Sequence, residues 1–314
     1  MKAIVVRNFN QSPKFETDFP TPTPQPNEVL INVTASSLSN RARSGATGSH
    51  YTSTDKLPMI PGVDGIGTLP TGEQVYFVNE GSFAEQVPVK KGHWVAVPDG
   101  LDAIKLAGMM NPALSSWMAL HYRAHFSVGQ KVMILGATGN AGMLAVQIAK
   151  RLGAAEIIAV ARNTKKLNQL TELGATQLID LSEGSTELNA KLAEAGRDVD
   201  IVLDYLWGNV TADTMTAIIP HRQNNQQPLQ WVEIGSSAGL TAPLPSAVFR
   251  ATALELIGSG QGSVASINIL HSLSAILAAE KAQPFTFYTH ALPIADVEMG
   301  WHLSGNKRVV FTLN

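Results

Sequence analysis

A glycine-rich turn between an apolar run and an amphipathic run constrains this chain more than any other feature. Residues 132–135 are all apolar, which predicts a strand that is buried on both faces. The turn from Gly136 to Gly142 follows, and from Met143 apolar residues recur with helical spacing up to Gly153, a typical residue at a helix C-terminus. Strand, turn and helix in this order begin a βαβ unit, whose helix N-terminus offers unpaired N–H groups to an anion.

The turn matches the dinucleotide pattern G-x-G-x-x-G, with an alanine in place of the first glycine. We expect Gly139 to let a pyrophosphate approach the backbone, and Gly142 to let the helix pack closely on the strand. Similar turns also occur in sheets that bind no ligand, but the strand–helix units that follow favour a nucleotide. The residues expected to contact the pyrophosphate are Ala137, Thr138, Gly139, Asn140, Ala141 and Gly142.

A basic segment after the second strand of this unit bears on the type of nucleotide. The strand is expected at 156–161, and Arg162 stands 20 residues beyond the last glycine of the turn, where an acid would bind a bare ribose 2′-OH. An arginine accommodates a 2′-phosphate instead, so we expect NADP(H), with Asn163 and Lys166 also in contact. The alternative is that Arg162 is a solvated loop residue followed by an ordinary basic first turn.

Composition limits the class of protein. A length of 314 residues exceeds one typical core and suggests two domains, while 45% hydrophobic and 15% charged residues are typical of a folded globule. The net charge of −2 gives no basis for binding nucleic acid or an anionic membrane. Without a membrane-spanning run or a signal peptide, a cytoplasmic location is expected. The lack of cysteine excludes disulfides, thiolate catalysis and cysteine-bound zinc.

The order of the expected elements predicts how the chain divides. The first 110 residues contain short strands between proline- and glycine-rich turns, as in a compact barrel, with a loop at 36–54. From Lys131 strands and helices alternate up to a sixth strand at 253–257, which predicts a parallel doubly wound sheet. The tail contains too little to fold alone. The expected domains are therefore a discontinuous substrate domain, 1–113 plus 262–314, and a nucleotide domain, 114–261.

Three local features carry expectations of their own. Pro112 is expected to separate a helix at 102–110 from another at 115–125. Thr164 is expected to cap the helix that follows the second strand of the sheet. His121 and His125 are spaced i, i+4, but no third ligand or glutamate accompanies them as in H-E-x-x-H, so no metal site is expected.

Several segments, taken in their order and spacing, are specific as a set. They are Lys2-Ala3-Ile4, residues 57–67, Gly81-Ser82-Phe83-Ala84-Glu85, residues 132–142, residues 199–204, Ile234-Gly235 and residues 307–310. With these segments the chain resembles the medium-chain dehydrogenase/reductase superfamily, specifically its zinc-free quinone oxidoreductase-like branch. The resemblance covers nearly the whole length, and it implies a Rossmann domain inserted into a β-rich GroES-like barrel domain. It further implies a nicotinamide in the cleft between the domains and a homodimer joined through the edge of the cofactor sheet.

The zinc-dependent alcohol dehydrogenases of that superfamily use cysteine and a Gly-His-Glu segment to hold the metal. Here the matching segment is Gly62-Val63-Asp64, and Asp64 is expected to orient its turn. Without a Lewis acid to polarise an alcohol oxygen, alcohol oxidation is not expected. A nicotinamide can still deliver hydride to an electron-poor carbon, so we expect an NADPH-dependent reductase of a quinone or an α,β-unsaturated carbonyl.

Candidate substrate-side and nicotinamide-side residues follow from the resemblance and from strand ends. The resemblance implies a hydroxyl beside the nicotinamide at Ser115, which alternatively caps a helix. Asn40 and Tyr51 are candidate substrate-side donors, although Tyr51 equally suits a packed loop aromatic. Tyr205 follows the fourth strand, where the family usually has small residues, and it either narrows the cofactor channel or only packs. Three further residues are expected to face the crevice at strand ends: Gly235, Ser236 and Ser259.

The sequence also bears on other classes of function. A non-enzymatic NADP(H)-binding sensor or structural protein of the same fold remains the alternative. A short-chain dehydrogenase is excluded because its Tyr-x-x-x-Lys pair is absent: Tyr51 is followed by Asp55, and Tyr122 by Phe126. A methyltransferase would leave the barrel-like first part of the chain unexplained.

Overall fold

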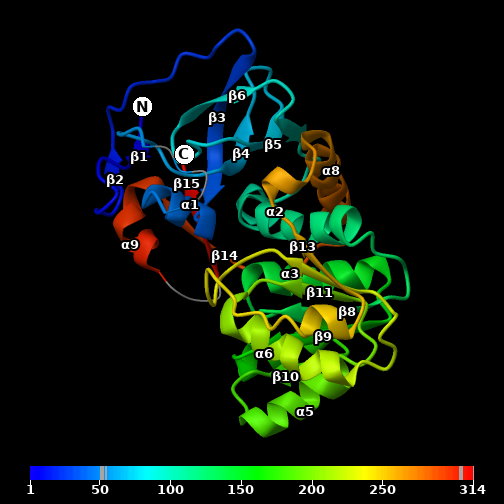
Figure 1. Cartoon of the computed structure of the whole chain (residues 1–314). Helices are drawn as coiled ribbons and strands as arrows, with labels where there is room; N and C mark the ends of the chain where they lie inside the picture. The colour runs from blue at the N-terminus through cyan, green and yellow to red at the C-terminus, as the bar shows by residue number, and fades with distance from the viewer. Residues whose placement is uncertain (50–52, 54, 304–306, 314) are drawn as a thin grey trace. The chain divides into compact units, whose positions relative to one another are not determined.

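The computed structural model describes residues 1–49, 53, 55–303 and 307–313, and the chain divides into two compact units. The first unit consists of Met1–Asn111 and Leu273–Asn314, and the second is Pro112–Ser272. Both boundaries fall inside helices, α2 (Ala103–Met118) and α8 (Ser266–Ala282), both labelled in Figure 1. The second boundary lies inside α8, between Ser272 and Leu273, and is later than the expected residue 262.

The second unit is built on a six-stranded sheet in which all neighbouring strands are parallel. The strand order is β10-β9-β8-β11-β12-β13, so the direction of winding reverses between β8 and β11. Ligands bind outside the carboxyl ends of the strands at such a reversal. The strands are β8 (Lys131–Leu135), β9 (Glu156–Ala161), β10 (Gln177–Asp180), β11 (Ile201–Asp204), β12 (Leu229–Glu233) and β13 (Leu254–Gly258).

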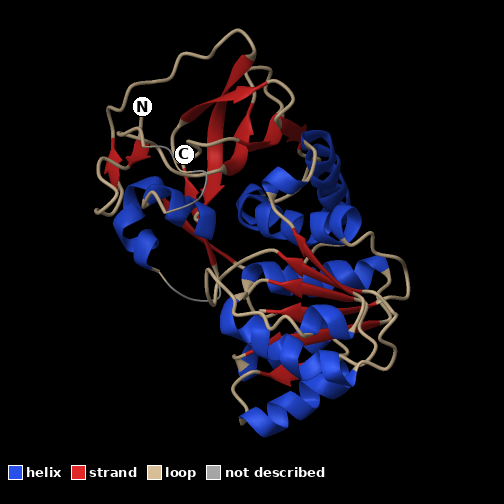
Figure 2. Ribbon diagram, viewed as in Figure 1, coloured by secondary structure: helices blue, strands red, loops and turns tan. Residues whose placement is uncertain are grey.

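Helices lie on both sides of this sheet, as Figure 2 shows. The central strands β8, β9 and β11 are buried on both faces, and the large core side chains include Met133, Ile158 and Trp231. The doubly wound parallel fold expected from the sequence is therefore confirmed. The helical segments are α3 (Asn140–Leu152), α4 (Thr164–Leu173), α5 (Ser185–Ala195), α6 (Gly208–Ile218), η2 (Ile219–His221), α7 (Val248–Ala251) and η3 (Gln261–Ser263).

The first unit contains a seven-stranded sheet and a small antiparallel pair. Strand β3 pairs with β4, β6 and β15, and its register shifts between Val33 and Ala35, so one long strand serves several neighbours. The tail contributes β14 and β15 to this sheet. The strands are β1 (Ala3–Val5), β2 (Lys14–Glu16), β3 (Glu28–Ser37), β4 (Asp64–Thr68), β5 (Gln74–Val78), β6 (Gln86–Lys90), β7 (Trp94–Ala96), β14 (Thr289–Pro293) and β15 (Arg308–Thr312).

The structure corrects two expectations about helices. The expected loop at 36–54 contains helix α1 (Asn40–Ala46), because Ser39 caps its first turn and its alanines Ala42 and Ala46 pack into the core. Pro112 does not end α2, which runs through it to Met118. Most neighbours of Pro112 in this helix are buried, so packing outweighs the backbone hydrogen bond that the proline removes. A π-helical turn, η1 (Ala119–Arg123), follows α2 directly.

Two further expectations are wrong by a short distance. The N-cap of α4 is Asn163 and not Thr164, because Asn163 Oδ1 accepts the Lys166 N–H at 3.1 Å. The strand expected at 285–289 lies later, at β14, since Phe285 and Phe287 are buried outside the sheet ladder. The tail then forms η4 (Ile294–Asp296) and α9 (Val297–His302) before β15.

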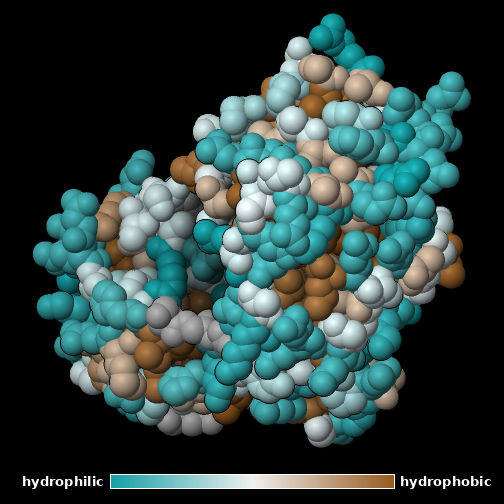
Figure 3. Space-filling model, turned by 90° about the horizontal axis from the view of Figure 1, so that it is seen from below, coloured by the Kyte–Doolittle hydropathy of each residue, from teal (hydrophilic) through white to brown (hydrophobic). Residues whose placement is uncertain are grey.

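The face shown in Figure 3 is mainly hydrophilic, and apolar residues appear on it in smaller groups between polar ones. Leu240 and Val128 are the most exposed large apolar side chains in the described part of the chain, at 87% and 82%. Within the same residues, no helix combines the length and apolarity needed to cross a lipid bilayer.

Candidate nucleotide-binding site

The glycine turn joins β8 to α3 and leaves the N-terminus of α3 without a side-chain cap. Gly139 occupies the N-cap position with an extended backbone (φ −73°, ψ 165°) and has no side chain to accept the first-turn amides. Those amides carry the partial positive charge of a helix N-terminus. A bound anion such as a pyrophosphate can accept hydrogen bonds from them.

Close packing explains why the turn needs its last glycine. A Cβ on Gly142 would lie 2.3 Å from the carbonyl oxygen of Gly136 and 2.6 Å from the Cα of Ala137, which no side chain tolerates. A Cβ on Gly139 would meet only the Gly136 oxygen, at 3.3 Å. The expected role of Gly142 in bringing helix and strand together is thus supported by the geometry.

The turn also uses a glycine that the motif does not contain. Gly136 has φ +86°, a conformation that favours glycine, while the fully buried Ala137 fills the first motif position. The N–H groups of both residues donate to Val160 O, at 2.9 and 3.2 Å, which fixes the turn to β9. In the sequence, the regular spacing of Gly136, Gly139 and Gly142, three residues apart, was the pattern that could have indicated the role of Gly136 in the turn.

The end of β9 presents the basic residues that were expected to bind a 2′-phosphate. Arg162 is exposed, and within the described residues no hydrogen bond or ion pair involves its guanidinium. Asn163 has a structural task as the cap of α4, although its side-chain amide N–H groups remain available. Lys166 lies half-buried in the first turn of that helix.

A carboxylate that the sequence analysis did not consider lies beside these basic residues. Asp180, at the end of β10, is in register with Ala161 and accepts hydrogen bonds from Thr164 Oγ1 and from the N–H and hydroxyl of Ser182. These hydrogen bonds lower the pKa of Asp180, the Ser182 hydroxyl contributing most. The carboxylate is therefore ionised at neutral pH, next to the position expected for the 2′-phosphate.

Tyr205 and Ser115 meet at the carboxyl end of β11. The two hydroxyl oxygens are 3.3 Å apart, and Ser115 Oγ also donates to Pro112 O at 2.6 Å. Burial raises the pKa of Tyr205 to about 12, against a smaller opposing effect of the hydroxyls of Ser115 and Ser116. Ser115 lies inside α2 and not at its start, so the alternative role as an N-cap is excluded.

The strand ends beyond β11 carry the remaining predicted residues. The N–H of Gly235 donates to Asp204 O at 3.2 Å, and Ser236, which follows, is exposed. Ser259 follows β13 and is only 7% exposed, yet its hydroxyl has no partner among the described residues. A buried hydroxyl without a partner is unusual, and a bound ligand would supply one.

In the first unit, Asp64 is the centre of a buried polar cluster. Its Oδ2 accepts the side-chain N–H of Asn111 at 2.7 Å, and its backbone oxygen accepts the Ser36 hydroxyl at 2.7 Å. Burial raises the pKa of Asp64 to about 6, partly offset by Asn111, then Arg308, Tyr76 and Arg41. Asp64 thus connects β4 to α2 within its own unit.

The two predicted substrate-side donors differ in how far the structure describes them. Asn40 is exposed at the first position of α1, directly after the capping Ser39. Tyr51 lies outside the described residues. Sequence reasoning did not single out Asn111 and Arg308, because only the fold brings them to Asp64.

Comparisons with known proteins agree with this geometry. A family model described as zinc-binding dehydrogenase matches residues 141–222. A protein of Emericella nidulans described as a probable NADPH-dependent quinone reductase is 28% identical over 98% of both chains. The quinone oxidoreductase of Rattus norvegicus is 24% identical over 66% of both. The solved quinone oxidoreductase of Thermus thermophilus has a TM-score of 0.84 with 24% identity, covering all of both chains. These similarities support the resemblance to the medium-chain dehydrogenase/reductase superfamily, in its quinone oxidoreductase-like branch.

The matching family model is described as zinc-binding, so the residues of this chain that could bind a metal ion matter. The residues matched by the family model lie entirely in the nucleotide unit, and the chain contains no cysteine. In the described part of the chain no group of three or more His, Asp or Glu side chains is arranged to hold a metal ion.

The histidine pair considered for a metal is also not on one regular helix. His121 lies in the π-helical turn η1, where it stacks on Trp117 with ring centroids 5.0 Å apart. His125 lies beyond that turn with φ +49°. The expected i, i+4 placement on an α-helix is therefore wrong, because the helix changes to a π-turn and ends first.

Proposed function

We propose that this protein is an NADPH-dependent oxidoreductase that transfers hydride to a quinone or an α,β-unsaturated carbonyl without a metal. The uncapped N-terminus of α3, reached through a turn in which Gly142 leaves no room for a side chain, carries the proposal. Arg162, exposed and unpaired within the described residues, supports the choice of a nucleotide with a 2′-phosphate. Relatives whose names state NADPH-dependent reduction of quinones or alkenals support the reaction class.

The residues of the second unit fit NADP(H) in a defined order. The amides from Thr138 to Gly142 would hold the pyrophosphate, and Arg162 with Lys166 would hold the 2′-phosphate. Ser115, Tyr205 and Ser259 would meet the nicotinamide half at the carboxyl ends of β11 and β13, on the other side of the glycine turn from Arg162. The remaining proposed contacts are Ala137, Asn163, Gly235 and Ser236.

Bound NADPH supplies a hydride to an electron-poor carbon. The task of the protein is then to hold donor and acceptor in contact and to offer a hydrogen bond to the acceptor oxygen as negative charge develops on it. We propose Asn40 and Tyr51 of the first unit for that hydrogen bond. Asp64 is fully buried and bonded to Asn111, so we assign it to orienting its turn.

Stopped-flow loss of NADPH absorbance, with a quinone panel and an enone panel, tests the proposal. We expect turnover with at least one panel and no change after dialysis against a chelator. Tight NADPH binding without turnover would favour the alternative, a non-enzymatic NADP(H)-binding sensor or structural protein. Turnover that depends on an added divalent ion would overturn the metal-free mechanism.

We also propose that the protein is a homodimer joined through β13. That strand forms an open edge of the sheet, and Leu256 on it is 39% exposed. An exposed, partly apolar edge strand readily pairs with a second chain. Light scattering coupled to size exclusion should give twice the 33.5 kDa chain mass, and Leu256→Lys should shift it to the monomer mass.

A further inference from the structure

If NADP(H) binds at the glycine turn, as the proposed function states, the strand order gives the direction in which the nucleotide lies across the sheet. The pyrophosphate turn follows β8, and Arg162 follows β9 on one side of it. On the other side the next strand is β11, followed by β12 and β13. Neighbouring strands are about 4.8 Å apart, so the first group beyond the pyrophosphate lies over the end of β11. In a dinucleotide this group is the nicotinamide-side ribose.

Tyr205 is the first residue after β11, and it is close to the glycine turn. A Cβ built on Gly136 would lie 3.4 Å from the Cβ of Tyr205. The Tyr205 N–H donates to Leu135 O at 3.2 Å, the last residue of β8. The base of this side chain therefore lies directly beside the place where the pyrophosphate would end.

The backbone around Tyr205 is held from both sides. Its carbonyl oxygen accepts the hydroxyl of Ser237 at 2.7 Å and the Ser237 N–H at 3.3 Å. The next two amides, of Leu206 and Trp207, both donate to the buried Oδ1 of Asp204, at 2.8 and 2.9 Å.

Trp207 has φ +56° and ψ −162°, a conformation that is rare outside glycine. Such strain persists only where the surroundings fix the backbone, and it is found mainly at functional sites. The segment that carries Tyr205 is thus preorganised rather than adaptable.

The hydrogen bonds that the Tyr205 hydroxyl already makes determine which further hydrogen bonds it can accept. Ser115 Oγ uses its proton on Pro112 O, so it accepts from the Tyr205 hydroxyl, 3.3 Å away. With its pKa raised to about 12 by burial, the phenol keeps this proton at neutral pH. The phenolic oxygen is left with lone pairs, which suit a hydroxyl donor.

We propose that the phenolic oxygen of Tyr205 accepts a hydrogen bond from a hydroxyl of the nicotinamide-side ribose, with Ser115 holding the phenol in position. The assignment rests on the proposed function, since it requires NADP(H) in the glycine turn. It makes Tyr205 a residue that positions the reactive half of the cofactor. It also gives a reason for a tyrosine where the family usually has a small residue.

Three nucleotides of increasing length test the assignment by isothermal titration calorimetry. Adenosine 2′,5′-bisphosphate contains only the adenosine half, 2′-phospho-ADP-ribose adds the second ribose, and NADP⁺ adds the nicotinamide ring. For Tyr205→Phe we expect the dissociation constants of the two longer probes to rise about 3- to 10-fold, which is the effect of one lost hydrogen bond. The constant for adenosine 2′,5′-bisphosphate should not change.

Two further variants make the result interpretable. Tyr122→Phe removes a phenolic hydroxyl elsewhere in the same unit and should change none of the three constants. Ser115→Ala leaves the phenol in place but unsupported, so it should give the same pattern as Tyr205→Phe with a smaller rise.

The possible outcomes separate this assignment from the proposed function. Equal weakening of all three probes, a loss confined to NADP⁺, or no change in Tyr205→Phe would each overturn the assignment while leaving the function intact. Failure of the wild-type protein to bind any of the three probes would overturn the proposed function itself.

Discussion

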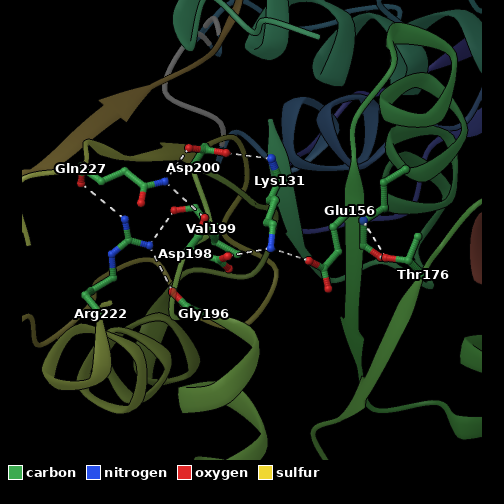
Figure 4. A network of polar contacts seen from close by, with 10 residues as sticks. Lys131, Glu156, Thr176, Gly196, Asp198, Val199, Asp200, Arg222 and Gln227 are labelled. Atoms are coloured by element: carbon green, nitrogen blue, oxygen red, sulfur yellow. Dashed lines mark hydrogen bonds and ion pairs between the residues drawn. The ribbon is translucent and has the colours of Figure 1, made fainter. Parts of the chain in front are cut away.

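The two ends of the six-stranded sheet use polar side chains in opposite ways. At the amino ends, Lys131 Nζ contacts Glu156 Oε2 at 3.0 Å and Asp198 Oδ2 at 2.6 Å, so the charges satisfy one another (Figure 4). At the carboxyl ends, Arg162 and the Ser259 hydroxyl have no partner among the described residues. Charge alone therefore does not mark a site. A polar group without a partner is informative where it lies at the strand ends that would face a ligand, because Arg222 Nε at the amino ends also has none among the described residues.

The amino-end network also joins elements that are distant in sequence. Arg222 Nη1 donates to Val199 O at 2.6 Å and to Gly196 O at 3.1 Å, which satisfies carbonyls at the end of α5 and before β11. Gln227 donates to Asp200 Oδ1 at 2.7 Å, and Asp200 Oδ2 accepts the Lys131 N–H at 2.8 Å, contacts that can be followed in Figure 4. This end should therefore contribute stability and no binding.

The largest effect should come from Gly142→Ala at the carboxyl end. The added Cβ would lie 2.3 Å from a backbone oxygen, so α3 must move away from the turn. We expect the dissociation constant of NADPH, measured by its fluorescence, to rise about 100-fold or more, because several amide bonds to the pyrophosphate are lost together. Gly184→Ala is the matched control: Gly184 is also an N-cap, with φ −60° and nothing within 4 Å of an added Cβ. An unchanged constant in Gly142→Ala would remove the turn from the site.

The amino end should respond to Arg222→Met in stability only. The variant loses buried hydrogen bonds to backbone carbonyls, and we expect the free energy of unfolding in urea to fall by about 2–3 kcal/mol. NADPH affinity should remain within twofold of wild type. In the control Arg197→Met the partner Glu194 is 72% exposed, so the loss should stay below about 0.5 kcal/mol. A large loss of NADPH affinity in Arg222→Met would contradict the view that the amino ends of the strands contribute stability and only the carboxyl ends bind the nucleotide.

Arg162→Asp should change the choice of nucleotide without changing stability. We expect the NADPH dissociation constant to rise roughly tenfold, about 1.4 kcal/mol, with NADH little affected. The exposed Arg250, changed to Asp, controls for a general charge effect in the same unit. If the ratio of NADPH to NADH affinity is the same in both variants, Arg162 does not contact the 2′-phosphate.

The smallest effect is expected from Asp180→Asn. Removing this ionised carboxylate next to the end of β9 should tighten NADPH about twofold to threefold at low salt and leave NADH unchanged. The Oδ1 of the asparagine can still accept from Ser182, and its amide N–H can donate to Thr164 Oγ1, so the melting temperature should hardly move. A gain that persists at about 1 M salt would show that the effect is not electrostatic.

Local patterns predicted most of the second unit. Helix α5 and strand β9 begin and end where apolar spacing and flanking glycines indicated, since both are set by contacts within a few residues. The glycine turn was also visible, because its chemistry depends on the lack of side chains at fixed positions. In the first unit a loop was expected at 36–54, and helix α1 was missed. Its two buried alanines give too weak a periodic pattern to predict a helix.

Spacing along the chain was enough to establish the parallel sheet, the glycine turn and the basic residue after β9, because each is a local pattern. The folded chain was needed to show that Pro112 stays inside a helix, that Asp180 lies beside Ala161, and that Tyr205 meets Ser115. Those outcomes depend on burial and on pairs of residues far apart in sequence. Local patterns carry no information about which distant residues will share a contact.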